Sequence, residues 1–365
     1  MKIREIVNAL ERFAPLPLQD DYDNSGLQTG FTEAEATGAL LCLDIDENVI
    51  QEAIDLGYNL IISHHPLIFY PLKSITGKDH IEKSLIKAIR NDITLYSAHT
   101  NLDNAPFGVS YNMATILGLK NIEVLSPKEE ALLKLVVYVP NNFVDKVREA
   151  LFTSGCGNIG NYDQCSFNSK GIGTFRPGNN SDPFIGKIGE SASVNETRIE
   201  TILPLHLKHK ALKALLAAHP YQEPAYDFIM LENSWKQAGS GVIGELPLAL
   251  SETEFLNSIK HLFKADVIKH NALRGQSIAK IAVCGGSGAF LIDKALKSGA
   301  DAFVTGEIGY HRFFGYDKSM LLIEIGHYES EQFVVELLEN ILKNSFPKLG
   351  IRKSKVKTNP TKYYF

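Results

Sequence analysis

An internal repeat constrains how this chain can fold. The stretch 53–62, AIDLGYNLII, resembles the stretch 295–304, ALKSGADAFV. Each stretch has the pattern of a helix end, a glycine that stops the helix, and a buried strand. Apolar runs before and after each copy predict further strands, at 39–43 and 93–98 in the first half and at 278–284 and 320–325 in the second. Strands that alternate with helices predict an α/β fold, in which two related halves form one domain.

The segment between the two copies has a different pattern. From about Leu132, apolar β-rich runs recur around two helix-like patterns, at 142–152 and 208–218. The inferred order β-α-β-β-β-α-β predicts a ferredoxin-like α+β module with an added hairpin strand. We therefore predict that residues 1–126 and 238–365 form one discontinuous domain, and that residues 127–237 form an inserted domain.

Composition excludes several classes of protein. The 365 residues are 44% hydrophobic and 22% charged, as in ordinary soluble domains, and no run of about 18 apolar residues predicts a membrane span. The net charge of -5 argues against a nucleic-acid-binding surface. The four cysteines form no C-x-x-C pair, and the chain starts with an amphipathic helix pattern rather than a signal peptide. We expect a reduced, cytoplasmic protein.

Imidazole and carboxylate groups follow the predicted strands. His64 and His65 end the apolar run at 60–62, and the repeat aligns them with Gly306 and Glu307. The repeat also aligns His99-x-x-x-Asp103 with His327-x-x-x-Glu331. In open α/β sheets, ligands bind at the carboxyl ends of the strands. Five of these residues therefore predict a metal site at that edge, since their side chains are ligands for zinc, iron, manganese or nickel: His64, His65, Asp103, His327 and Glu331.

Two features favour this interpretation over a polar strand end without a ligand. Adjacent residues of a regular strand point to opposite faces, but Pro66 bends the chain after His65, so both rings can face one cavity. A helix that starts near Tyr328 would bring His327 and Glu331 onto one face. Five ligands are too many for one tetrahedral ion with an open position, but they suit two ions that a carboxylate bridges.

A glycine-rich stretch is a second candidate site. Gly285, Gly286, Ser287 and Gly288 lie between a predicted strand and a predicted helix, where backbone N–H groups can hold a phosphate. The alternative is a tight turn without a ligand. His99 and Glu307 are expected near the metal cavity, either as proton carriers or as hydrogen-bonded residues that orient the ligands.

The motifs together resemble the Nif-three-like family, whose members are curated as GTP cyclohydrolase 1 type 2 homologues. The resemblance spans nearly the whole chain, on the stretches 23–28 (DNSGLQ), 63–69 (SHHPLIF), 99–103 (HTNLD), 285–288 (GGSG), 305–307 (TGE) and 326–331 (GHYESE). It implies a dinuclear metal centre with the five ligands above and Glu331 as the bridge. It also implies a toroidal homohexamer, a trimer of dimers, and an inserted domain similar to PII and CutA proteins.

The candidate ligands and the resemblance together imply that the protein is a metal-dependent hydrolase acting on a nucleotide-like substrate. We expect two divalent metal ions as cofactors, with zinc as the first expectation and iron, manganese or nickel as alternatives. Glu307 and His99 are the candidate catalytic residues. Two other functions remain open, a non-catalytic metal-binding hexamer with an assembly or regulatory role, and a dimetal phosphoesterase. We expect neither a membrane nor a nucleic-acid partner.

Overall fold

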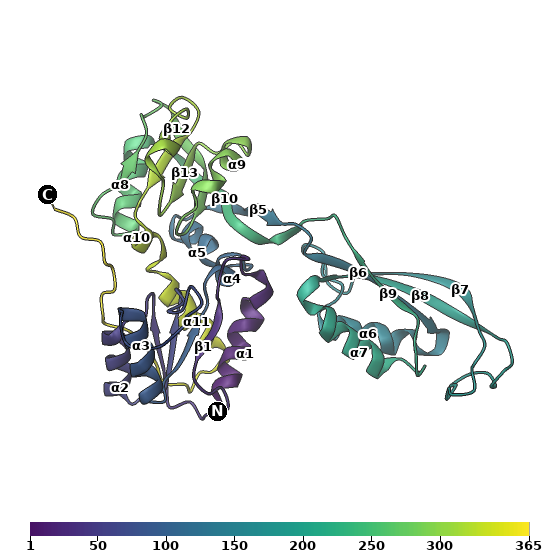
Figure 1. Ribbon diagram of the computed structural model, residues 1–365. Coiled ribbons are helices and arrows are strands. Elements are labelled where there is room, and N and C mark those ends of the chain that lie inside the picture. Colours follow the sequence, from purple (N-terminus) through teal and green to yellow (C-terminus); the bar gives the residue numbers. More distant parts are fainter. Residues whose placement is uncertain (365) are drawn as a thin grey trace. The chain divides into compact units, whose positions relative to one another are not determined.

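The computed structural model describes residues 1–364, and the chain divides into two compact units. Unit 1 combines Met1–Ser126 with the segment that begins at Gln237, and unit 2 comprises Pro127–Lys236. Both units contain helices and strands, so this is a mixed α/β protein (Figure 1). Within residues 1–364, none of the helices is both long and apolar enough to cross a membrane.

The first sheet of unit 1 contains five short strands. They are β1 (Gly26–Thr29), β2 (Ala39–Cys42), β3 (Leu60–Ser63), β4 (Thr94–Ser97) and β15 (Ile351–Lys353). Their order is β1-β4-β3-β2-β15, with β1 antiparallel to β4 and the remaining pairs parallel. β2, β3 and β4 are buried along their whole length because elements cover both faces, which explains the apolar character of β2 and β3.

Helices cover both faces of this sheet. The helices of the first half are α1 (Ile3–Phe13), α2 (Glu47–Leu56), α3 (His80–Arg90), α4 (Thr100–Asp103) and α5 (Val109–Ile116), with a short 3-10 helix at Leu16–Leu18. Asp46 caps the N-terminus of α2, and Gly57 ends the helix with a φ of 68°, a conformation that favours glycine. Figure 1 shows α2 and α3 together on one side of the strands and α1 on the other. The side chains of Val49 and Leu85 join Leu40 and Ile61 in one buried cluster.

The second sheet of unit 1 is built around the other copy of the repeat. Its strands are β5 (Lys120–Lys128), β10 (Trp235–Ser251), β11 (Lys269–His270), β12 (Ser277–Cys284), β13 (Ala302–Thr305) and β14 (Leu321–Glu324), in the order β11-β14-β13-β12-β10-β5. β12, β13 and β14 are parallel, whereas β10 pairs antiparallel with β12 and β11 pairs antiparallel with β14. The helices of the second half are α8 (Glu252–Leu262), α9 (Ile292–Lys297), α10 (His327–Glu331) and α11 (Val334–Ser345), with 3-10 helices at Ala289–Leu291 and Tyr310–Phe313. Of these, α11 packs against α1 and against β2 and β15 of the first sheet.

The two sheets contain the same parallel core. In the first sheet β3 lies between β2 and β4, and in the second β13 lies between β12 and β14. Strands are therefore present at the six positions that the repeat predicts. Because all six strands are parallel within their sheets, the carboxyl ends of each trio lie at one edge. Those edges carry the residues of the candidate site.

Unit 2 contains a four-stranded antiparallel sheet. Its strands are β6 (Leu132–Pro140), β7 (Ser166–Phe175), β8 (Ala192–Pro204) and β9 (Tyr226–Met230), in the order β7-β8-β6-β9. The helices α6 (Val144–Ser154) and α7 (Lys208–Ala218), each preceded by a 3-10 turn (Asn141–Phe143 and Leu205–Leu207), pack together on one face (Figure 1).

One expectation for this unit was wrong. Two strands, and not three, connect α6 to α7, because residues 176–191 form a loop within the described chain. This loop contains Pro177, Pro183, Gly186 and Gly189, and the two glycines adopt positive φ angles that interrupt extended structure.

Candidate metal centre

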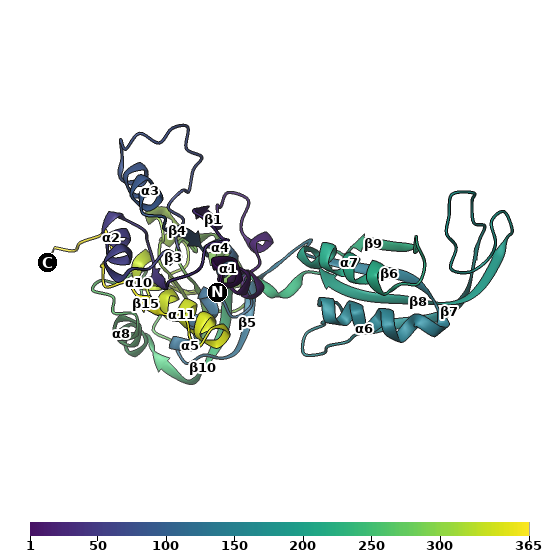
Figure 2. The ribbon, with the colours of Figure 1, turned by 90° about the horizontal axis from the view of Figure 1, so that it is seen from below.

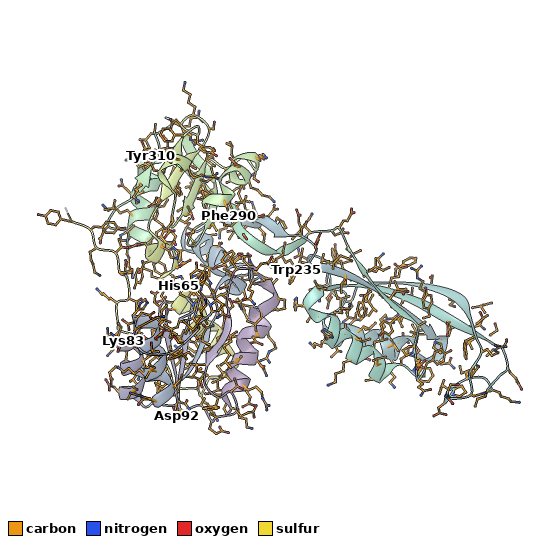
Figure 3. All side chains as sticks on the ribbon, viewed as in Figure 1. His65, Lys83, Asp92, Trp235, Phe290 and Tyr310 are labelled. Atoms are coloured by element: carbon orange, nitrogen blue, oxygen red, sulfur yellow. The ribbon has the colours of Figure 1, made fainter. Side chains whose placement is uncertain are left out.

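His64 and His65 lie directly beyond the carboxyl end of β3. The N–H groups of His64 and His65 donate to the carbonyl oxygens of Cys42 (3.2 Å) and Leu43 (2.9 Å), so both residues stay paired with the neighbouring segment. Their rings nevertheless converge, with centroids 4.9 Å apart. His64 is completely buried, and His65 is partly exposed. The adjacent pair therefore supplies two imidazoles to one region, and Figure 3 shows the labelled His65 between the strands of the two sheets.

His327 and Glu331 approach the same region from the second half. α10 begins at His327, after Gly326, whose φ of 98° turns the chain at the end of β14. Because His327 and Glu331 are one helical turn apart, their side chains meet, with 3.0 Å between His327 Nε2 and Glu331 Oε2. The Glu331 Oε2 atom also lies 3.0 Å from Nε2 of His65. Glu331 is thus a buried carboxylate between imidazoles of both halves.

Asp103, on α4 after the end of β4, faces His64. Its Oδ1 atom lies 3.7 Å from His64 Nε2, which is too far for a hydrogen bond. Both atoms are buried, and neither has a hydrogen-bond partner among the described residues. Buried polar atoms without partners are unfavourable, and a cation between the two atoms would satisfy both. This pair of donors fits a metal ion.

The three histidines share one arrangement of their ring nitrogens. In each ring an oxygen acceptor lies within hydrogen-bond distance of Nδ1, so that Nε2 faces the shared region. The acceptors are Ala98 O for His64 (2.7 Å), Asp44 Oδ1 for His65 (2.7 Å) and Glu307 Oε1 for His327 (3.0 Å). Metal-binding histidines in proteins are generally oriented in this way, because the bond at one nitrogen sets which nitrogen is free for the metal.

The donor atoms form two groups that share Glu331. One group contains His65, His327 and Glu331, and the other contains His64, Asp103 and Glu331, with the atoms of each group within 4.8 Å of one another. Oε2 of Glu331 belongs to the first group, at 3.0 Å from both imidazoles, and Oε1 lies 3.7 Å from His64 Nε2 in the second. The two Nε2 atoms of the first group are 3.3 Å apart. Ligands of a tetrahedral zinc ion at about 2.0–2.1 Å lie about 3.3 Å from one another, so this group has the right size.

His99 completes a third group of possible ligands with His64 and His65. Its ring centroid is 5.2 Å from that of His64 and 5.4 Å from that of His65. Nδ1 of His99 lies 2.7 Å from Oδ1 of Asp23, and Asp23 also accepts hydrogen bonds from Thr100. His99 is therefore held as firmly as the other three histidines, with a carboxylate behind it.

Electrostatics at Glu331 favour positive charge nearby. Burial opposes ionisation of Glu331, but the adjacent imidazoles of His327 and His64 outweigh it, and they hold the pKa of Glu331 well below its usual range. Burial also disfavours the charged form of His65, yet hydrogen bonds with Asp44 and Glu331 raise its pKa to about 10. In the same way Glu331 overcomes the burial of His327 and raises its pKa to about 9. Glu331 therefore attracts positive charge from both sides, as a carboxylate that receives a divalent cation would.

In the second group, which contains His64 and Asp103, burial dominates the pKa values. Burial raises the pKa of Asp103 well above its usual range, and the negative charge of Glu331 adds to this effect. Burial lowers the pKa of His64. The ligand atoms of this group are therefore poorly solvated and lack a neutralising charge of their own, which again fits a cation that the side chains are arranged to receive.

The glycine-rich stretch packs against the metal centre. A Cβ atom at Gly286 would lie 2.4 Å from Oε1 of Glu331, so only glycine lets the loop approach this carboxylate. The N–H groups of Gly285, Gly286 and Gly288 donate to the hydroxyls of Ser110, Ser330 and Thr305. These donors are already used within the protein, which leaves the loop fewer groups for a phosphate. The glycines are thus required for packing whether or not the loop binds a ligand.

Glu307 and two residues that the sequence analysis left without a role support the ligands. Glu307 contacts His327 through one oxygen and Ser287 through the other. Asp44, behind His65, follows the end of β2, so the rule that polar residues gather at carboxyl ends could have identified it. Asp23, behind His99, comes from a loop before β1 and has no such signal, beyond its place in the motif 23–28.

Comparison with known families shows to which family this chain belongs. Residues 1–360 match the family described as Duf34/NIF3 (NGG1p interacting factor 3). The chain belongs to this family. Among curated relatives of this NIF3-family chain, it is 41% identical over 362 residues to a GTP cyclohydrolase 1 type 2 homolog of Halalkalibacterium halodurans, covering 97% of each chain. It is 35% identical over 364 residues to the protein of the same name in Bacillus subtilis, covering 98% of this chain and 97% of the relative.

A solved structure supports the same assignment for the fold. The NIF3-family chain is similar to a crystal structure of a Bacillus cereus protein related to NIF3, with a TM-score of 0.86 and 37% identity. The similarity covers 100% of this chain and 99% of the other. The likeness therefore includes both units, since no large part of either chain is left unmatched.

Proposed function

We propose that this NIF3-family chain is a dinuclear metal-dependent hydrolase acting on a nucleotide-like substrate. The observation that carries the proposal is the position of Glu331. Its two oxygens belong to two different groups of donors, so one buried carboxylate can bridge two ions. The names of the curated relatives, GTP cyclohydrolase 1 type 2 homologs, suggest the substrate class.

In this proposal one ion is held by His65, His327 and Glu331, and the other by His64, Asp103 and Glu331. Each ion would have three protein ligands and room for another, as in catalytic sites. Zinc is our first choice because the 3.0–3.3 Å separations in the first group suit a tetrahedral ion. Iron, manganese and nickel accept the same ligand types.

Ions bound here would supply Lewis acidity and would lower the pKa of a water molecule. His99 would carry the proton that is released, through Nε2. Asp23 suits His99 to this role, because its carboxylate lies 2.7 Å from Nδ1 and fixes the ring. Burial opposes ionisation of Asp23, but hydrogen bonds from His99, Ser25 and Thr100 hold its pKa well below the usual range, so the negative charge is permanent near neutral pH.

Glu307 would orient His327 rather than move protons, since both of its oxygens already have partners. In the loop Gly285–Gly288 we propose that the backbone N–H of Ser287 contacts a substrate phosphate, because the three glycine N–H groups have protein acceptors and the Ser287 hydroxyl donates to Glu307. For GTP, water would add to C8 of the imidazole ring, and hydrolysis would release formate.

Metal content tests the site independently of any substrate. Protein purified without added metal, then dialysed against zinc, should hold two ions per chain by elemental analysis. Glu331→Gln should lower the metal content below one ion per chain, because it removes a ligand oxygen from both groups of donors. Glu336→Gln changes an exposed residue on α11 and should leave the content at two ions per chain. Two ions in Glu331→Gln would contradict the bridging role.

Activity tests the substrate. Metal-loaded protein under anaerobic conditions is incubated with GTP, and formate is measured over time. Formate release should disappear in His65→Ala and persist in His209→Ala, an exposed histidine of unit 2. Two bound ions without any formate would remove GTP as the substrate. Release of phosphate in its place would favour a dimetal phosphoesterase, and no turnover of either kind would favour a metal-binding assembly protein.

We also propose that the chain forms a homohexamer and that unit 2 is a PII/CutA-like module that promotes this assembly. The proposal rests on the family resemblance. Light scattering of the full chain and of a variant lacking residues 127–237 tests it, with a hexamer expected only for the full chain.

A further inference from the structure

Unit 2 contains a cavity of about 610 Å³ that the metal centre does not use. Residues of β7 and β8, the loop 177–185 and the turn after α7 line it. On β8, Ile199 and Leu203 pack against the helices, so Glu196 and Arg198 project from the opposite face of the sheet. The cavity therefore lies on the face that α6 and α7 leave uncovered, and its size is in the range of sites for small molecules. Figure 2 shows the loop between β7 and β8 at the end of this sheet.

Two glycines of β7 create room in this cavity. A Cβ atom added at Gly171 would meet nothing within 4 Å, so the position opens onto empty space. A Cβ atom at Gly173 would lie 2.1 Å from Oε2 of Glu196, so a side chain at this position would force the carboxylate to move. Gly173 thus leaves room for the carboxylate of Glu196, and Gly171 leaves open space in the cavity beside it.

Glu196 is a buried carboxylate with little compensation. It is 8% exposed, and Oε1 accepts a hydrogen bond from the Tyr221 hydroxyl at 2.8 Å. In the part of the chain that the structure describes, no lysine or arginine pairs with Glu196, and Arg198 is engaged by Glu200 at 3.0 Å. Buried charges are normally paired, because the loss of hydration is costly. Oε2 of Glu196 is therefore available to a positively charged donor.

Aromatic rings stand around this carboxylate. The ring of Tyr221 lies 5.8 Å from that of Phe175 and 6.5 Å from that of Phe184, measured between centroids. All three residues line the cavity. Gln222 accepts a hydrogen bond from the N–H of Asp182 at 3.0 Å, which ties the loop that carries Phe184 to the turn that carries Tyr221. Aromatic faces attract cations and bind apolar groups.

We propose that this cavity binds a small organic cation, an ammonium group attached to an apolar or aromatic body. The ammonium group donates to Oε2 of Glu196, and the body contacts Phe175, Phe184 and Tyr221. A neutral or anionic ligand would leave Oε2 of Glu196 without a cationic partner. The proposal does not depend on the metal centre or on the function proposed for it.

Calorimetry with 2-phenylethylamine tests this idea on the full chain. Its neutral counterpart, 2-phenylethanol, has nearly the same shape and lacks the charge. We expect saturable binding of the amine, and at least about tenfold weaker binding of the alcohol, since hydrogen bonds to charged groups contribute about 1.5–3 kcal/mol. Equal binding of the two probes would overturn the assignment of a cation, and so would the absence of binding at millimolar amine.

Three variants locate the binding. Glu196→Gln should weaken the amine at least about tenfold, whereas Glu149→Gln, an exposed residue on α6, should leave it unchanged. Gly171→Leu places a side chain into the open space of the cavity, so it should block the amine while the unfolding temperature stays near that of the parent protein. Unaltered binding in either Glu196→Gln or Gly171→Leu would show that the amine binds elsewhere and would refute the proposal.

Discussion

The carboxylate of Asp44 lies 2.7 Å from Nδ1 of His65, and the hydroxyl of Thr358, 314 residues away in sequence from Asp44, donates to its other oxygen. Asp44 is thus held from both sides, and it fixes the ring of His65 with Nε2 directed at Glu331. Asp44 is not a candidate ligand itself, but it can control the candidate metal centre through the orientation of His65.

We expect Asp44→Asn to weaken metal binding. The amide cannot stabilise positive charge on the imidazole, and removal of such supporting carboxylates typically lowers metal affinity about 10–100-fold. Competition with a chromophoric zinc chelator measures the change. Asp55→Asn, an exposed position at the end of α2, serves as the control, and equal affinities for the two variants would contradict the supporting role.

A methyl group at Gly286 should displace Glu331. Gly286 has a φ of 59°, and its added Cβ would lie 2.4 Å from Oε1 of Glu331. Gly299 offers a matched control, because its φ is 75° but nothing lies within 4 Å of the added atom. Both alanine variants should lose about 1 kcal/mol of stability from backbone strain, measured by urea denaturation. Gly286→Ala alone should bind metal at least tenfold more weakly, and retained affinity would show that Glu331 can move without loss.

His99→Asn separates a proton carrier from a ligand. If His99 moves protons, the variant should keep its full metal content and lose about 10²–10⁴-fold in turnover, the usual range for general acid–base residues. Elemental analysis and formate release from GTP measure the two quantities on one sample. A loss of one ion per chain would instead identify His99 as a ligand, as its grouping with His64 and His65 allows.

Glu82 should make the stability of unit 1 depend on acid. Its carboxylate accepts hydrogen bonds from the N–H groups of Thr76, Gly77 and Lys78, and the Thr76 bond is the largest cause that lowers its pKa from 4.5 to about 2. Because the folded pKa is below the unfolded one, the stabilising effect is complete above about pH 5 and is lost as the pH falls toward 2.

Urea denaturation from pH 7 to pH 2.5 tests this. Glu82→Gln should be less stable than the parent protein at pH 7, and the difference should shrink on acidification. The substitution Glu47→Gln, at an exposed position on α2, should give a difference close to zero throughout. A difference between Glu82→Gln and the parent that stays constant with pH would exclude ionisation of Glu82 as its source.

The parallel core was predictable because strands that are buried on both faces are continuous apolar runs in the sequence. β2 and β3 must be apolar throughout, so their runs, and the glycine that precedes β3, stand out in the sequence and repeat in the second half. The candidate metal donors could be found for the same reason, since they follow strands whose ends were recognisable.

Other parts could not be predicted, because tertiary contacts define them. β15 has the sequence IRK and is partly exposed, and only its pairing with β2 makes it a strand. Asp23 comes to His99 from a loop, and nothing in the local sequence indicates that distance. The strand expected between the helices of unit 2 does not form, because the prolines and the positive-φ glycines of residues 176–191 interrupt extended structure.

The order of the strands in the second sheet also suggests how unit 2 could have been added to this chain. β5 leads into unit 2 and β10 leads out of it, and the two are neighbours in the sheet. A chain without unit 2 could therefore join them by a short hairpin turn and keep every other strand in place. A single genetic insertion or deletion at that turn would be enough to add or remove the whole unit, and the residues of the metal centre would not need to change.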